Sequence, residues 1–217
     1  MYRTPEAMMT SLLDRICFII SPAAGPVDVE RYVLGPARRS LDAGIRWVQY
    51  RDKYESRKNI YSTALRLREL TRQFSACLII NDHADIALAV EADGVHLGQD
   101  DLPLKEARKL LPDKIIGIST HNKEEAVEAE KGGADYIGFG PIFPTTTKDA
   151  GAPKGPDTVI GIKNAVGLPI IAIGGINAGN AASVFNAGAY GIAVSSGIAQ
   201  GNIEENVRKL LAAAERT

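Results

Sequence analysis

Short apolar runs recur along the chain, and a charged segment follows each of them. The runs are rich in Ile, Val and Leu, and they lie at residues 16–21, 45–50, 77–81, 94–97, 115–118, 136–139, 169–173 and 191–194. Short, continuously apolar runs of this kind are typical of strands that are buried on both faces. The pattern therefore predicts eight buried strands.

The segments between these runs have the periodicity of amphipathic helices. In residues 57–74 the apolar positions recur every three or four residues, at Ile60, Ala64, Leu67 and Leu70. Residues 124–131 and 180–186 behave likewise, which is expected of helices that pack one face against a sheet. Strand and helix alternate about eight times, and parallel neighbours need such crossovers. The order favours a closed (β/α)8 TIM barrel over an open doubly wound sheet.

Composition narrows the class of protein. The chain has 217 residues, of which 45% are hydrophobic and 24% charged, with a formal net charge of -1. This predicts one globular α/β domain over residues 1–217, and the absence of a basic stripe argues against a nucleic-acid partner. No apolar stretch approaches the roughly 18 to 20 residues of a membrane span, and the first residues lack the layout of a signal peptide. We expect a cytoplasmic enzyme, and an oligomer is compatible with the sequence.

The two cysteines, Cys17 and Cys77, each sit within an apolar run. Their spacing matches no metal motif, so we expect buried, inert thiols.

Cationic and amide side chains follow the second predicted strand, at Gln49, Arg51 and Lys53. Alternation along a strand places these three residues on one side. Arg offers a bidentate fork and Lys a point charge, so the group suits a polyanion.

Carboxylates end the third and fourth predicted strands, at Asp82, after Asn81, and at Asp101. Because the active site of a barrel lies at the carboxyl ends of its strands, both face the same end as the cationic group. Open carboxylate oxygens suit Mg²⁺ that shares substrate phosphates. Each carboxylate could instead cap the helix that follows it, and the sequence leaves that alternative open.

Histidines and a serine lie near the next strands. Ser119 ends the fifth strand and could contact a substrate. His121 follows it and could act as a general base, although a lone exposed histidine usually does not. His96 lies inside a buried strand, so we interpret it as a satisfied core or supporting group.

The remaining strand ends predict a phosphate site. A loop at 144–156 carries hydroxyls and a lysine, and the seventh and eighth strands end in Gly174-Gly175 and Ser195-Ser196. Small residues expose backbone N–H groups there, as in many phosphate-binding barrels. With the Arg- and Lys-rich group, the sequence offers two anion sites, which suits a transferase that expels diphosphate and joins the remainder to a second phosphorylated molecule.

These blocks resemble the thiamine-phosphate synthase family. The matching segments run in order over nearly the whole chain, at 48–53, 80–82, 92–101, 116–119, 133–141, 143–148, 172–176 and 193–196. The resemblance implies two small-molecule substrates, a hydroxymethylpyrimidine diphosphate and a thiazole phosphate. Their products would be thiamine phosphate and diphosphate, formed by a dissociative reaction in which diphosphate leaves first.

The resemblance also implies roles for individual residues. The pyrimidine diphosphate would be bound by Gln49, Arg51, Lys53, Asn81, Ser119 and Lys148, of which Arg51, Lys53, Ser119 and Lys148 would serve catalysis. The thiazole phosphate would be bound by Thr145, Thr147, Gly175, Ser195 and Ser196. Tyr50, Asp52 and Thr146 lie inside the matching blocks and are expected to contact substrate. Asp82 and Asp101 would hold Mg²⁺.

The nearest alternative is the thiazole tautomerase, an isomerase built on the same barrel, which resembles this chain too. That enzyme uses a histidine after the fifth strand, as at His121, and it has no diphosphate to bind. The acidic pair and the Gln49, Arg51 and Lys53 group favour the synthase. A catalytically inactive, phosphate-binding regulatory barrel is a third reading, and the joint presence of the charged positions argues against it.

Overall fold

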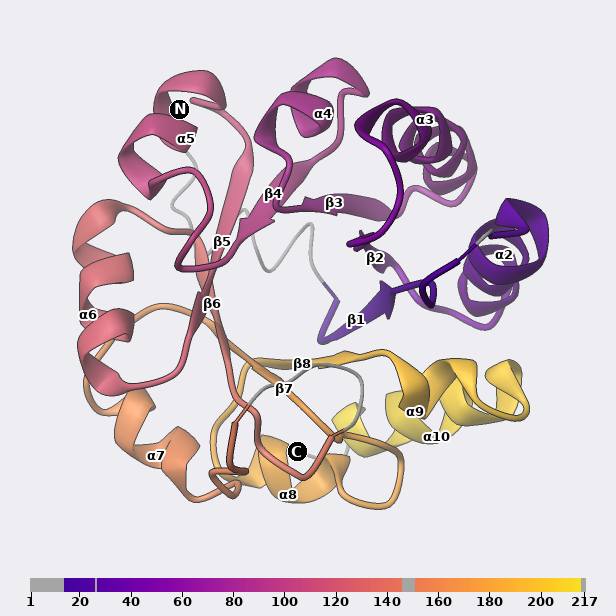
Figure 1. Ribbon diagram of the computed structural model, residues 1–217. Coiled ribbons are helices and arrows are strands. Elements are labelled where there is room, and N and C mark those ends of the chain that lie inside the picture. The colour runs from indigo at the N-terminus through magenta and orange to yellow at the C-terminus, as the bar shows by residue number, and fades with distance from the viewer. Residues whose placement is uncertain (1–13, 26, 146–150, 216–217) are drawn as a thin grey trace.

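Eight parallel strands close into a barrel in the computed structural model, which describes residues 14–25, 27–145 and 151–215. The strands follow one another in chain order, and the last pairs with the first (Figure 1). They are β1 (Ile16–Ile20), β2 (Trp47–Tyr50), β3 (Cys77–Asn81), β4 (Gly94–Leu97), β5 (Ile115–Thr120), β6 (Tyr136–Phe139), β7 (Ile170–Ile173) and β8 (Gly191–Val194). The predicted (β/α)8 barrel is confirmed.

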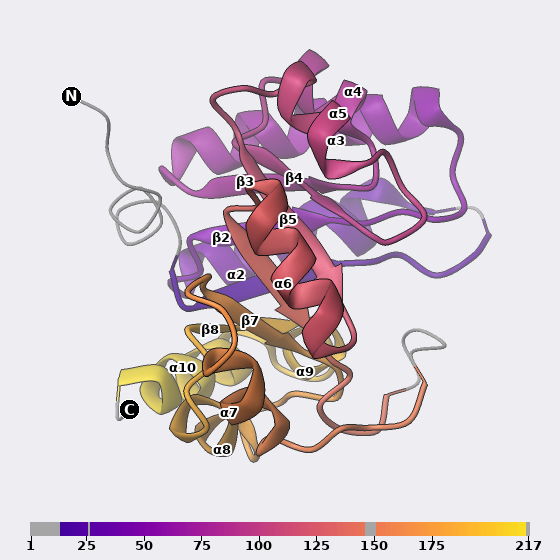
Figure 2. The ribbon, with the colours of Figure 1, turned by 90° about the vertical axis from the view of Figure 1, so that its left-hand side faces the viewer.

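Helices surround the barrel, as Figures 1 and 2 show. They are a π-helical turn η1 (Glu30–Leu34), then α2 (Gly35–Asp42), α3 (Arg57–Gln73), α4 (Ala84–Ala89), α5 (Leu104–Leu110), α6 (Lys123–Gly132), α7 (Thr158–Lys163), α8 (Ala181–Asn186), α9 (Ser196–Ala199) and α10 (Ile203–Glu215). The start of α6 has a local cause, because the Asn122 side chain accepts a hydrogen bond from the Glu125 N–H and caps the helix. None of the helices described is both long and apolar enough to cross a membrane.

Alternation along the strands builds two apolar layers. Outward residues such as Phe18 and Val48 pack against the helices. Inward residues fill the barrel, and Trp47 meets Tyr136 edge to face, with ring centroids 5.3 Å apart. Cys17 and Cys77 belong to this inner layer as buried free thiols, as predicted. The large inner side chains close the barrel interior, so polar chemistry is left to the carboxyl ends of the strands.

Strand boundaries differ slightly from those predicted. β2 begins at Trp47, two residues later than the apolar run, and β5 extends to Thr120, two residues further. The extension arises because Ser119 and Thr120 pair with Gly138 and Phe139 of β6. Polar residues can thus continue a strand when a neighbour accepts their backbone groups.

Candidate active site

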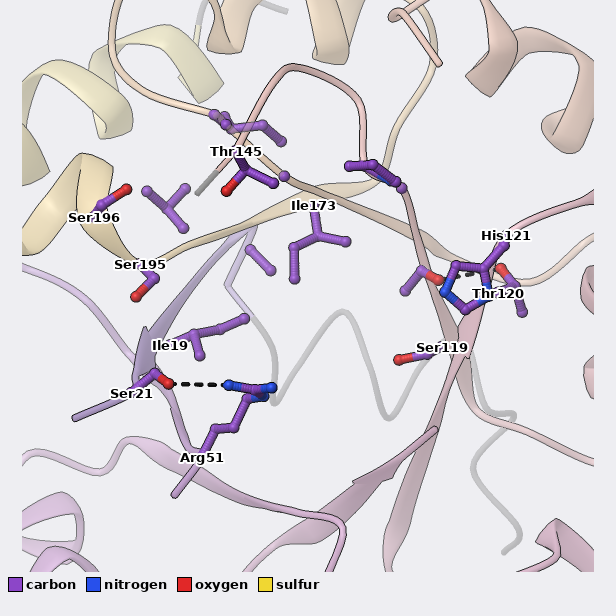
Figure 3. Close-up of a pocket in the computed structure, with 18 residues that line it drawn as sticks. Ile19, Ser21, Arg51, Ser119, Thr120, His121, Thr145, Ile173, Ser195 and Ser196 are labelled. Atoms are coloured by element: carbon purple, nitrogen blue, oxygen red, sulfur yellow. Dashed lines mark hydrogen bonds between the residues drawn. The ribbon is translucent and has the colours of Figure 1, made fainter. Parts of the chain in front are cut away.

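A cavity opens at the carboxyl ends of β1, β2 and β5 to β8 (Figure 3). Six of the predicted site residues line it: Arg51, Ser119, Thr145, Gly175, Ser195 and Ser196. Ile19 and Ile173 lie between the polar groups and give the cavity an apolar wall. The cavity therefore offers hydroxyls, one guanidinium and a surface suited to a flat ring.

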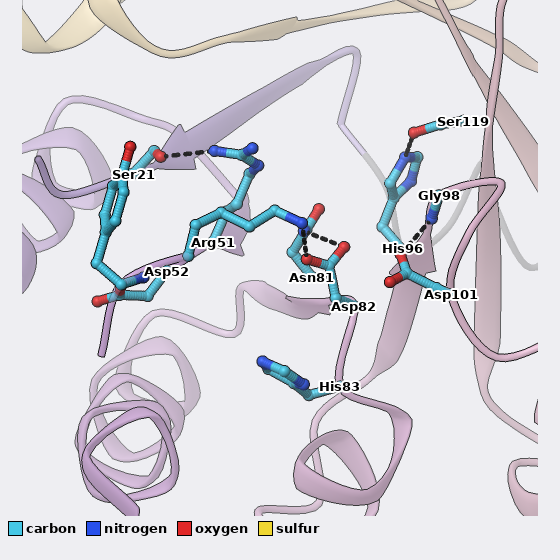
Figure 4. Close-up of polar contacts among 12 residues, drawn as sticks. Ser21, Arg51, Asp52, Asn81, Asp82, His83, His96, Gly98, Asp101 and Ser119 are labelled. Atoms are coloured by element: carbon cyan, nitrogen blue, oxygen red, sulfur yellow. Dashed lines mark hydrogen bonds and ion pairs between the residues drawn. The ribbon is translucent and has the colours of Figure 1, made fainter. Parts of the chain in front are cut away.

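Arg51 is oriented by the end of β1. Its backbone N–H donates to the Ile20 carbonyl at 2.9 Å, and its Nη1 donates to Ser21 Oγ at 3.1 Å (Figures 3 and 4). Ser21 was not among the predicted site residues. Its place at the end of the first apolar run was the only signal for it.

Small residues are required on the β7 side of the cavity. Gly174 and Gly175 both adopt positive φ, at 101° and 63°. A Cβ on Gly175 would overlap the Pro144 carbonyl oxygen. The chain from β6 therefore passes directly against this turn, which brings Thr145 to the same cavity as Ser195 and Ser196.

A second, adjoining cavity holds the acidic pair. Lys53, Asp82 and Asp101 line it, together with Asp52. Lys53 Nζ lies 2.5 Å from Asp82 Oδ2, and the lysine side chain is 43% exposed and the aspartate side chain 13%. Figure 4 shows Asp82 close to Asn81 at this end of the barrel. The cationic group is thus divided, because Arg51 faces the first cavity and Lys53 the second.

The two carboxylates influence each other. Burial raises the pKa of Asp82, but hydrogen bonds with Lys53 and Asp101 and the positive charges of Lys53 and Arg51 outweigh it, so the pKa lies below its ordinary value. Burial also raises the pKa of Asp101; a hydrogen bond from the Gly98 N–H opposes this, but the neighbouring Asp82 adds to it, and the pKa lies above its ordinary value. The two carboxyl groups are thus close enough to interact, and a cation beside them would relieve the repulsion between their negative charges.

Helix capping does not explain these carboxylates. Helix α4 starts after His83 and α5 after Pro103, and neither start has a side-chain cap. Asp82 instead accepts from Lys53 and from the Asn81 amide, and Asp101 Oδ2 accepts from the Gly98 N–H at 2.6 Å. The capping alternative is therefore wrong for both residues.

The donor set of the acidic pair fits Mg²⁺ as a shared ion. In the described part of the chain, no group of three or more His, Cys, Asp or Glu side chains is placed to hold a metal. Mg²⁺ commonly uses only one or two protein carboxylates and completes its shell with water and substrate phosphates. Asp82 and Asp101 satisfy that pattern.

Buried amides connect the barrel interior to this pair. Gln49 Nε2 donates to Asn81 Oδ1 at 2.8 Å, and Asn81 Nδ2 donates to Asp82 Oδ1. Both amides are almost fully buried, at 4% and 8% exposure. Gln49 and Asn81 thus lie beneath the mouth and hold Asp82 from below.

Five of the predicted residues need separate mention. Tyr50 faces the helices: it is 2% exposed, and its hydroxyl donates to Asp52 at 3.2 Å. The structure does not bring Tyr50 to either of these cavities. Asp52 lines the second cavity, but its carboxylate also accepts from the Tyr54 and Glu55 N–H groups and so shapes the turn after β2. Thr146, Thr147 and Lys148 lie outside the described residues.

Two histidines approach the first cavity. His121 lines it, and its Nδ1 lies 3.0 Å from Glu125 Oε2. His96 is 8% exposed, and its Nε2 lies 2.9 Å from Ser119 Oγ. The prediction that His96 is a satisfied, supporting group is confirmed, whereas its contact with Ser119 was not predicted.

Comparison with known proteins settles the family. The model described as thiamine monophosphate synthase matches residues 16–198. The chain belongs to this family. The thiamine monophosphate synthase model thus spans all eight strands and both cavities, from the start of β1 into helix α9.

Individual members of the thiamine monophosphate synthase family are similar over most of their length. The thiamine-phosphate synthase of Chloroflexus aurantiacus is 53% identical over 160 residues, which cover 73% of this chain and 74% of that protein. The one from Methanosarcina barkeri is 43% identical over 211 residues, covering 96% and 94%. The structure of the Pyrococcus furiosus thiamine phosphate pyrophosphorylase superimposes with a TM-score of 0.82 at 36% identity, covering 93% of this chain and 96% of that one. This chain is therefore similar throughout to named transferases.

Proposed function

We propose that this protein is a thiamine-phosphate synthase that requires Mg²⁺. It would transfer the hydroxymethylpyrimidine group from its diphosphate to a thiazole phosphate. One observation carries the proposal beyond family membership: a cavity with an apolar wall and hydroxyl-rich rim adjoins a cavity built from Lys53, Asp82 and Asp101. The first suits rings and a monophosphate, and the second suits a diphosphate with its counter-ion.

The charged residues would act on the leaving group. The bond between the pyrimidinylmethyl carbon and the diphosphate oxygen breaks, and its electron pair leaves with the diphosphate. Arg51 and Lys53 stabilise that developing negative charge from two sides. Mg²⁺ held by Asp82 and Asp101 would supply further positive charge there.

The cavity would position the second partner. After diphosphate departs, the thiazole nitrogen donates its lone pair to the pyrimidinylmethyl cation and forms the new C–N bond. Ser195, Ser196 and Gly175 line this cavity, as do Ile19 and Ile173. The first three would bind the thiazole phosphate, and the two isoleucines would flank the rings. An apolar wall matters because water reaching the cation would give an alcohol instead of thiamine phosphate. This scheme needs no protein nucleophile.

One observation favours a second candidate, the thiazole tautomerase. His121 lines the same cavity and is oriented by Glu125, as a general base would be. A tautomerase would have no use for the Lys53, Asp82 and Asp101 cluster. We therefore prefer the synthase.

The test is a coupling assay with the purified protein. Both substrates are mixed with Mg²⁺, and thiamine phosphate and diphosphate are measured over time. We expect the two products in equal amounts, and none when the thiazole phosphate is replaced by inorganic phosphate. Isomerisation of a thiazole phosphate without coupling would instead support the tautomerase.

A further inference from the structure

Ser119 is the last member of a hydrogen-bonded series of three polar side chains, of which the other two, His96 and Tyr136, are buried. Its Oγ lies 2.9 Å from His96 Nε2, and His96 Nδ1 lies 2.9 Å from the Tyr136 hydroxyl oxygen. Figure 4 shows the contact between His96 and Ser119. His96, Ser119 and Tyr136 come from the neighbouring strands β4, β5 and β6, so the series runs across the barrel interior towards the cavity.

The Tyr136 hydroxyl proton has a defined destination. Tyr136 is 1% exposed, and burial raises the pKa of its hydroxyl well above the usual range, so the proton stays on the oxygen. Within the described part of the chain, His96 Nδ1 is its hydrogen-bond partner. A buried hydroxyl that left its proton unpaired would pay a desolvation cost of roughly 1–3 kcal/mol. Tyr136 therefore donates, and His96 Nδ1 accepts.

The direction of the hydrogen bond from Tyr136 to His96 determines where the protons of His96 and Ser119 lie. An imidazole that accepts at Nδ1 carries its proton on Nε2. His96 Nε2–H then donates to Ser119 Oγ, so the serine proton is free to turn away from His96 and into the cavity. We propose that Tyr136 and His96 are positioning residues that hold the Ser119 hydroxyl as a hydrogen-bond donor to the bound substrate.

The neighbouring strands leave room for this arrangement. A Cβ on Gly117 would overlap the Tyr136 ring, and a Cβ on Gly138 would lie 3.0 Å from His96 Cε1. Glycine weakens a strand interior and often marks the close approach of another group. Gly117 and Gly138 thus accommodate the two rings, whose centroids lie 5.5 Å apart.

The proposal rests on the proposed function, because it assigns Ser119 an acceptor atom on the substrate of that site. A fixed donor selects a ligand with an acceptor at this point and rejects one that presents its own N–H or O–H. If His96 carried its proton on Nδ1, Ser119 would donate to His96, and the cavity would face an oxygen lone pair. Two positions remote from the substrate therefore set the polarity of its contact.

The first test needs no turnover, so it stands even if the proposed activity is not found. The chain has three histidines, and ¹⁵N-histidine NMR can separate them with His83→Asn and His121→Asn variants. We expect the pattern of an Nε2–H imidazole for His96 in the wild-type protein, and a mixture of tautomers in Tyr136→Phe. An Nδ1–H or doubly protonated His96 in the wild type at neutral pH would overturn the proposal.

The second test is a double-mutant cycle in the coupling assay. Tyr136→Phe should lower kcat/KM about three- to tenfold, as for one misdirected hydrogen bond to substrate. In the Ser119→Ala background the same change should have no further effect, because Tyr136 acts through that hydroxyl. An equal loss in both backgrounds would show that Tyr136 is only structural, and the proposal would fall.

Conservative replacements of His96 add a rescue. The Gln side chain can present an N–H where His96 Nε2 lies, whereas Asn is too short to reach Ser119. His96→Gln should therefore retain most of the wild-type kcat/KM, and His96→Asn should fall to the level of Ser119→Ala. Equal losses in the two variants would contradict the proposed donor role.

Discussion

Replacing Asp82 by Asn tests the acidic pair with little disturbance to the fold. Asp82 has a left-handed backbone, with φ of 66°. Asn enters that region readily, whereas Ala would add a strain of about 1 kcal/mol, so Asp82→Asn isolates the loss of charge. The amide oxygen can still accept the hydrogen bond from Asn81.

The structure predicts a small change in stability and a large change in rate. Asp82→Asn breaks the ion pair with Lys53, whose side chain is 43% exposed and can be rehydrated. A pair of this kind contributes about 0–1 kcal/mol to the free energy of unfolding. If Asp82 holds Mg²⁺ against the leaving diphosphate, kcat/KM should fall on the order of 10² to 10³, as for loss of one charge-stabilising group.

The assay measures kcat/KM at saturating Mg²⁺ alongside urea unfolding of the same samples. Glu91→Gln is a matched control, because Glu91 also has a left-handed backbone, with φ of 54°, and pairs with Arg72. Glu91 precedes β4 and so lies at the amino ends of the strands, opposite the two cavities. The kcat/KM of Glu91→Gln should therefore equal the wild-type value. Full turnover of Asp82→Asn, or of the wild type in excess EDTA, would refute the Mg²⁺ role.

Three further predictions concern other parts of the molecule. His121→Ala should leave coupling within about tenfold of wild type, or about 1.4 kcal/mol in barrier, and abolished coupling would show that this histidine is essential. The hydrogen bond from Arg39 lowers the pKa of Glu204 from 4.5 to about 2, so its contribution to stability is present above pH 4.5 and is lost as the pH falls towards 2. Urea unfolding should therefore separate Glu204→Gln from wild type at neutral pH and not near pH 2; a constant difference would contradict this linkage. Burial raises the pKa of both Cys17 and Cys77, so a thiol reagent should label them only after unfolding, and rapid labelling of the native protein would show that the barrel opens.

The strands were predictable because their physical signal is local. Each of the eight is a short apolar run buried on both faces, and the predicted ends differ from the structure by two residues or fewer. The sequence was less informative about which cavity each residue at the end of β2 faces. Alternation predicted that Gln49, Arg51 and Lys53 share one side, but β2 ends at Tyr50, and beyond it the turn sends Arg51 and Lys53 to different cavities.

The acidic pair shows a second limit of sequence reasoning. A carboxylate between a strand and a helix fits a cap as well as a ligand site, and the left-handed backbone of Asp82 arises only when the neighbouring strand fixes the chain there. His96 posed the same difficulty, because its partners Ser119 and Tyr136 are 23 and 40 residues away in the chain. The roles of Thr146, Thr147 and Lys148, and the Mg²⁺ requirement, stay predictions.

The pairing of β1 with β8 makes the whole cavity a late product of folding. Ile16 of β1 lies in register with Ile192 of β8, so closure joins residues from almost opposite ends of the sequence. Such non-local contacts form slowly and follow the local ones. Ser21 and Arg51 line the same cavity as Ser195 and Ser196, on the other side of this seam, and a chain still being synthesised could not present them together. Ligand binding would therefore report on completion of the barrel, and a bound ligand would slow the opening of the seam.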